Sequence, residues 1–107
     1  MLNPAPPAPS TPADRFPLLT FVALTDMPHV SDRNGTTIAP YSASIAYRPA
    51  TGSRDLAWTA QVSGYRVLPN GVVDMDSTCI ELNGATDRDL IPDALLARIE
   101  GRIPLIP

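Results

Sequence analysis

Residues 56–82, LAWTAQVSGYRVLPNGVVDMDSTCIEL, decide the fold of this 107-residue chain. Two segments of alternating apolar and polar residues flank Asn70-Gly71, and Asn-Gly in this setting is a strong indication of a β-hairpin. Both central residues of a type I′ turn have a positive φ, so we expect Asn70 and Gly71 to form such a turn. Gly64 lies inside the first segment and indicates a bulge or a close approach of a second backbone. The two predicted strands are Leu56–Leu68 and Val72–Leu82.

The alternation also predicts which residues of the hairpin are buried. In the first strand, Trp58, Ala60 and Val62 alternate with polar residues and are expected to share one face. The returning strand has mixed polarity on both faces, so its register stays open. We expect Cys79 in this strand to be a packed core thiol, because the nearby acids do not favour a reactive thiolate. One face of the returning strand holds Val73, Met75, Ser77 and Cys79, and the other holds Asp74, Asp76, Thr78 and Ile80.

Two further strands are predicted upstream of the hairpin. The segment Phe16–Thr25 is apolar on both faces, as in a strand buried on both sides or a strand that lies under an arm. The segment Ile38–Arg48 alternates with a period of two, and Pro40 indicates an edge position or a late start for this strand. One face of the second strand holds Tyr41, Ala43, Ile45 and Tyr47.

One helix is predicted downstream, over residues 90–101. Ile91, Leu95 and Ile99, together with Leu96, form an apolar stripe at helical spacing. Thr86 or Asp89 can cap this helix, and because Pro92 is tolerated only in the first turn, Asp89 is favoured as the N-cap. The tail Ile103–Pro107 is too apolar to remain in water, so it either folds back onto the sheet or docks into a neighbouring subunit.

These elements predict an α+β, mainly β, fold with about four antiparallel strands, one C-terminal helix and an extended arm at each end. Residues 1–12 contain five Pro and no charged side chain, and they are expected to form an extended, Pro-rich arm. Residues 13–107 form a single small domain, because the chain is too short for two domains that fold separately. The apolar tail of this domain is residues 103–107.

The composition excludes several classes of function. The formal net charge is −3 and the eight basic residues are all Arg, so binding to a nucleic-acid backbone is not expected. No apolar segment is long enough to span a membrane, and no signal peptide is recognisable at the start of the sequence. A single Cys cannot form an internal disulfide bond, which indicates a reducing compartment. We expect a cytoplasmic protein of a GC-rich bacterium, or a virion protein if the gene belongs to a phage.

Patterns that could carry chemistry are weak. The alternating acids from Asp74 resemble the start of a calcium loop, but Cys79 stands where the loop needs Gly and Ala85 where it needs Glu. His29 is the only histidine, and Ser and Asp residues lie near it in the sequence, as a Ser-His-Asp catalytic triad would require. The sequence has no nucleophile-elbow motif, which argues against such a triad. We therefore expect no enzymatic activity, no metal and no cofactor.

What remains are features of a protein-interaction module. The Pro-rich arm, the apolar tail and the edge strands suit docking to a groove or strand addition to a partner. We expect a non-catalytic assembly module that binds itself or a larger assembly, such as an accessory subunit of a bacteriophage particle. The alternatives are an inhibitor or adaptor that binds one host protein, and a small ligand-binding protein or enzyme that uses His29. The residues expected to contact a partner are Pro4, Pro6, Pro7, Pro9, Ile103, Leu105 and Ile106.

Overall fold

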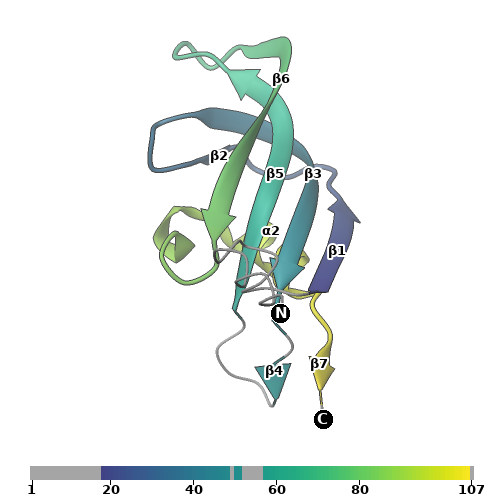
Figure 1. The fold of residues 1–107 in the computed structure, drawn as a ribbon. Helices are drawn as coiled ribbons and strands as arrows, with labels where there is room; N and C mark the ends of the chain where they lie inside the picture. Colours follow the sequence, from purple (N-terminus) through teal and green to yellow (C-terminus); the bar gives the residue numbers. More distant parts are fainter. Residues whose placement is uncertain (1–17, 49, 52–56, 107) are drawn as a thin grey trace, which may run out of the picture.

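The computed structural model describes residues 18–48, 50–51 and 57–106 (Figure 1). Strands form most of the described chain, and a short 3-10 helix and one α-helix follow the last long strand. The elements are β1 (Leu18–Ala23), β2 (Val30–Ser31), β3 (Thr37–Tyr47), β4 (Ala50–Thr51), β5 (Trp58–Val67), β6 (Val73–Asn83), η1 (Arg88–Leu90), α2 (Asp93–Glu100) and β7 (Leu105–Ile106).

The main sheet is antiparallel and has the order β1-β3-β5-β6, with β2 also paired to β3. The short strands β4 and β7 form a separate parallel pair. In Figure 1 the helix α2 lies across one face of the main sheet, behind β3 and β5. The predicted α+β, mainly β, fold with an antiparallel sheet and one helix is confirmed.

The hairpin between β5 and β6 closes differently from the prediction. The amide of Gly71 donates to the carbonyl of Leu68 at 2.8 Å, and the amide of Leu68 donates to the carbonyl of Val72 at 2.8 Å. Gly71 has a φ of 86°, whereas Asn70 is not among the described residues with a positive φ. This is the pattern of a type I turn followed by a left-handed glycine, so the predicted type I′ turn is wrong. Pro69 favours the first central position of a type I turn, which moves the turn one residue upstream.

Strand β3 lies between β1 and β5 and begins at Thr37, so both predictions for Pro40, an edge position and a late start of the strand, are wrong. The register shifts between Pro40 and Ser42, and this bulge accommodates a proline within a central strand. Gly64 pairs with Pro40, and a Cβ atom at Gly64 would lie 2.4 Å from the carbonyl oxygen of Ala39. The close approach predicted for Gly64 is therefore confirmed. Tyr41 lies in the bulge and is 39% exposed, whereas Ala43, Ile45 and Tyr47 are buried, so the prediction that Tyr41 shares their face is wrong.

Strand β1 lies at an edge and is buried on one face only. Val22 is 4% exposed, but Leu19 is 74% exposed and Phe21 is 55% exposed. The prediction of a strand buried on both sides is therefore wrong, since no helix of the described residues covers the outer face of the sheet. The alternative of a strand under an arm involves residues 1–17, which lie outside the described residues.

The core lies between α2 and the facing side of the sheet. The predicted burial of Ile91, Leu95 and Ile99 is confirmed, because Leu95 and Ile99 are fully buried and Ile91 is 5% exposed, but only Leu95 and Ile99 belong to the helix. The helix begins at Asp93, with Pro92 as its N-cap, so the predicted cap at Asp89 is wrong. A residue before proline is held extended, and Ile91 has φ −92° and ψ 121°, which interrupts the helix there. No helix in the described part of the chain is long and apolar enough to cross a membrane.

Candidate functional site

The β1 edge of the sheet is covered by the chain itself. The amide of Leu24 donates to the carbonyl of Tyr41 at 2.9 Å, and the antiparallel register then directs the carbonyls of Phe21 and Ala23 away from β3. Nε of Arg102 donates to the carbonyl of Phe21, and Nη2 of Arg98 donates to that of Ala23, both at 3.1 Å. These two arginines occupy two neighbouring acceptors that a further strand would need.

The opposite edge, formed by β6, is open in its middle. The amide of Gly84 donates to the carbonyl of Trp58 at 2.9 Å, so Gly84 and Trp58 lie opposite each other and are hydrogen-bonded. The next pair of the β5–β6 ladder is Thr59 with Asn83. Alternate residues of an antiparallel strand bond to opposite sides, so the even-numbered residues of this part of β6 bond to β5. The backbone groups of Ser77, Cys79 and Glu81 consequently point outward, and no described residue bonds to them.

Side chains close both ends of this edge. The amide of Asn83 donates to Oδ2 of Asp87 at 2.8 Å, and the carbonyl of Asn83 accepts from the amide of Asp87 at 3.0 Å. At the other end, the amide of Met75 donates to Oδ1 of Asp74 at 2.7 Å. These contacts leave residues 77–81 available for strand pairing. We call this segment the open edge.

Cys79 lies at the centre of the open edge. It is exposed, so the predicted packed core thiol is wrong. The pairing of Val62 with Ile80 places Ile80 on the core face, where it is 3% exposed, and thus places Cys79 on the outer face. The sequence did not show which face of β6 is buried, because both faces have mixed polarity. Ile80 and Leu82 are the only large apolar residues that mark the buried face.

Exposed apolar side chains gather beside the open edge. Met75 is 86% exposed and Val73 is 44% exposed, both on β6. The rings of Tyr41 and Tyr65 lie with centroids 5.1 Å apart, and Oη of Tyr41 donates to Oγ of Ser77 at 3.3 Å. Aromatic and Met side chains of this kind are enriched in protein interfaces.

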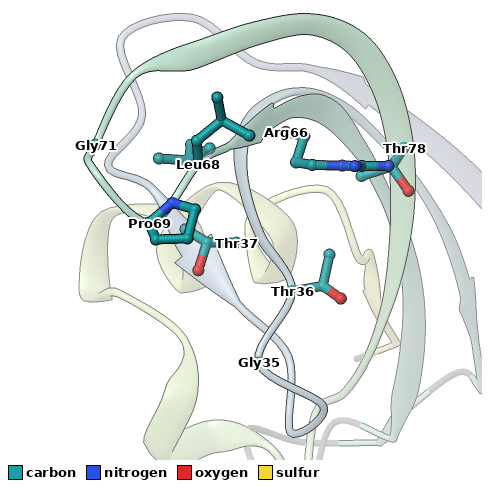
Figure 2. A pocket seen from close by; sticks show the side chains of 9 residues that line it. Gly35, Thr36, Thr37, Arg66, Leu68, Pro69, Gly71 and Thr78 are labelled. Carbon is teal, nitrogen blue, oxygen red and sulfur yellow. The ribbon is translucent and has the colours of Figure 1, made fainter.

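A pocket of about 710 Å³ opens between the β2–β3 turn and the tip of the β5–β6 hairpin (Figure 2). Figure 2 shows the side chain of Arg66 running across this pocket toward Thr78. The pocket takes its walls from both hairpins, and Arg66 is the single charged residue among those that line it. Further lining residues are Gly35, Thr36, Thr37 and Leu68.

An ion-pair network fixes the loop between β6 and α2. Nε of Arg33 donates to Oδ1 of Asp87 at 2.7 Å, and its Nη2 donates to Asp89 at 2.9 Å and to the carbonyl of Thr86. The hydrogen bond with Asp87, followed by the charge of Asp89, raises the pKa of Arg33. The network holds the loop against the β2–β3 turn and so supports the nearby side of the pocket.

Of the predicted partner-binding residues, the structure describes Ile103, Leu105 and Ile106. Pro4, Pro6, Pro7 and Pro9 lie outside the described residues. Ile103 is 4% exposed within the core of its own chain, so at this position the tail folds back and is not available for docking. Leu105 and Ile106 form β7, which pairs in parallel with β4.

The surroundings of His29 do not form a triad among the described residues. His29 is exposed in the loop between β1 and β2. Oγ of Ser31 shares a hydrogen bond of 2.6 Å with Oγ1 of Thr37, and Oδ1 of Asp32 accepts from the backbone amides of Asn34 and Thr36. Within the described ranges, no group of three His, Cys, Asp or Glu residues could hold a metal ion.

Comparisons with protein-family models, with curated proteins and with solved structures find no match to this chain. Function is therefore inferred from the chemistry of the open edge and the pocket.

Proposed function

We propose that this protein is a non-catalytic assembly module, in which two copies pair through their open β6 edges. The observation that carries this proposal is the difference between the two edges of the sheet. Arginine side chains occupy the outward carbonyls of Phe21 and Ala23 on β1, whereas the outward backbone groups of Ser77, Cys79 and Glu81 have no partner among the described residues. Unpaired edges are templates for a further strand, and self-pairing of an edge satisfies them in both copies.

The hydrogen-bond pattern selects one antiparallel register. With a twofold axis at Cys79, this residue pairs with Cys79 of the second copy, and Ser77 pairs with Glu81 of the second copy. All outward groups of the open edge are then paired with one another. A shift of two residues would instead require the amide of Met75 or the groups of Asn83, which Asp74 and Asp87 already occupy.

Charge is compatible with this register. Glu81 faces a serine of the second copy, and Asp76 falls opposite Leu82. No acid lies directly opposite another acid, which would destabilise the pair of strands. Exposed Met75, at 86%, adds apolar surface at each end of the paired segment.

The expected dimer is weak and depends on concentration. The register supplies about six backbone hydrogen bonds, each with a net contribution of about 1 kcal/mol. Association costs at least about 4 kcal/mol in lost translational and rotational freedom. A protein of this kind acts where its local concentration is high, as in a particle or a larger complex. We further propose a reducing setting, the bacterial cytoplasm or a phage particle assembled in it, which the exposed thiol of Cys79 supports.

The test is to block the edge with proline while leaving the β5–β6 ladder intact. The amide of Cys79 points outward, so Cys79→Pro removes a donor that the ladder does not use. We expect light scattering after size exclusion, at concentrations from about 10 μM to 1 mM, to show a dimer for the wild type and for Cys79→Ser. Cys79→Pro should remain monomeric with a nearly unchanged circular dichroism spectrum.

Cross-linking tests the register itself. In the proposed pairing the two Cys79 Cα atoms lie about 5.5 Å apart, which permits a disulfide bond. With diamide as the oxidant, the wild type should cross-link readily under non-denaturing conditions. The matched control Cys79→Ser/Ser77→Cys moves the thiol by two residues and separates the two cysteines by about 13 Å, so it should cross-link far more slowly. Equal rates for both proteins, or a dimer in Cys79→Pro, would overturn the proposal.

A further inference from the structure

We propose that the pocket around Arg66 binds the carboxylate of a ligand that carries an apolar group next to that carboxylate. The chemistry fits both a small organic acid and the C-terminal end of a peptide. This site lies between the two hairpin tips rather than on the outward backbone of β6, so it does not depend on the proposed pairing of two copies.

Arg66 differs from the other arginines that the structure describes. The side chain of each of the others has a partner within the chain, whereas the side chain of Arg66 makes no ion pair or hydrogen bond to a described residue. An arginine extended across a pocket without a partner keeps its donors available for an incoming anion. The engaged arginines are Arg33, Arg48, Arg88, Arg98 and Arg102.

The lining of the pocket favours an anion. No acid among the described residues lines it, although the chain as a whole carries a net charge of −3. Thr36, Thr37 and Thr78 contribute hydroxyl groups to the lining of the pocket, and Oγ1 of Thr37 shares a hydrogen bond of 2.6 Å with Oγ of Ser31. Asp74 lies on the neighbouring strand β6 but does not line the pocket, and its Oδ1 accepts the amide of Met75.

The size and polarity of the pocket indicate the class of anion. One guanidinium matches the two oxygens of a single carboxylate, and no second cation lines the pocket to balance a phosphate dianion. Val67, Leu68 and Pro69 form an apolar side beside Arg66. A volume of about 710 Å³ lies within the range of small-molecule sites. A carboxylate with an adjacent aliphatic side chain, as in a leucine at the C-terminus of a peptide, matches both the guanidinium of Arg66 and the apolar side of the pocket.

The probes are N-acetyl-L-leucine and its neutral counterpart N-acetyl-L-leucinamide, added to the full chain. We expect N-acetyl-L-leucine to shift the NMR signals of the Arg66 Nε–H group and of the amides of Thr36 and Thr78. The leucinamide should bind at least about tenfold more weakly, because a charge-assisted pair with arginine is lost. Equal binding of the two probes, or no binding of the acid up to its solubility limit, would overturn the site.

Variants at Arg66 separate the charge from the shape of the pocket. Arg66 is exposed and has no partner among the described residues, so Arg66→Gln is expected to fold normally. It should weaken binding of N-acetyl-L-leucine at least about tenfold, and the matched control Arg66→Lys should lose less because it keeps the charge. Wild-type affinity in Arg66→Gln contradicts the proposal.

A third probe distinguishes the two sources of the carboxylate. The peptide N-acetyl-Ala-Ala-Leu, with a free C-terminus, should bind more tightly than N-acetyl-L-leucine if the pocket accepts a chain end. Equal affinity assigns the site to small organic acids. Tight binding of the same peptide with an amidated C-terminus would show that the carboxylate is not recognised, and would overturn the proposal.

Discussion

Nε1 of Trp58 donates a hydrogen bond of 3.0 Å to Oε2 of Glu100, and this bond joins the centre of the sheet to the last turn of α2. Trp58 is 1% exposed, so its indole N–H needs a partner within the protein. Both Nη atoms of Arg88 also donate to the same carboxylate, at 2.9 and 3.0 Å. Burial alone would raise the pKa of Glu100, but the hydrogen bonds from Arg88 and Trp58 outweigh it and lower the pKa.

Glu100→Gln should reduce the free energy of unfolding at pH 7 by about 1–2 kcal/mol, because it removes charge-assisted hydrogen bonds at a partly buried site. Since the folded pKa is lowered from its ordinary value of 4.5, the unfolded state binds more protons and the stabilisation by Glu100 disappears as the pH falls below that value. The difference between wild type and variant should therefore be constant near neutral pH and shrink in acid. Urea unfolding followed by the fluorescence of Trp58 measures this difference in the free energy of unfolding. A difference that does not change with pH would contradict the prediction.

Gly84→Ala should destabilise the fold by about 1–3 kcal/mol, as expected for overpacking. A Cβ atom at this position would lie 2.4 Å from Cε2 of Trp58, and a fully buried ring has no room to move. The control Ala85→Ser changes the adjacent, exposed residue and should stay within about 0.5 kcal/mol of the wild type. Thermal and urea unfolding compare the two variants, and equal stabilities would show that the indole ring can shift.

Arg98→Ala/Arg102→Ala should convert limited association into open-ended growth. Without these side chains, the carbonyls of Phe21 and Ala23 become available, and the sheet then has two pairing edges. Heterologous pairing through both edges does not close and produces filaments. Light scattering over time should show growth for the double variant, and adding Cys79→Pro should suppress it. Growth that persists after Cys79→Pro would mean that β6 is not the second edge.

Deletion of residues 1–12 should leave the melting temperature within about 3 °C of the wild type, because this segment has too little apolar content to form a core. We also predict weaker assembly without the Pro-rich arm. The mass of the full chain and that of a chain starting at Ala13, measured at equal concentrations, test this prediction. A large drop in melting temperature would contradict it, because it would mean that the arm is part of the folded domain.

The sequence predicted the elements whose signals are local. Alternation around Trp58 and Val62, the turn before Val73 and the helical stripe from Ile91 to Ile99 each depend on residues close together in the chain. Gly64 was interpretable as well, since a glycine inside a strand has few other causes. These signals suffice for the class of the fold and for one face of the core.

Tertiary structure decided which strands lie at the edges and what occupies those edges. Pro40 reads as an edge residue in the sequence, but its pairing with Gly64 across a bulge permits it in the centre of the sheet. The arginines that close the β1 edge are about 80 positions away in the sequence, with Arg102 and Phe21 separated by 81. No local pattern encodes such a contact.

The same reasoning holds for the two candidate sites. Exposure of Cys79 depends on a register that mixed polarity leaves ambiguous, and only the burial of Ile80 and Leu82 against the helix resolves it. The pocket exists because the β2–β3 turn and the β5–β6 hairpin come together around Arg66. Local preferences of the backbone thus determine the strands and the helix, whereas packing between distant segments determines which polar groups are left without partners and are available for binding.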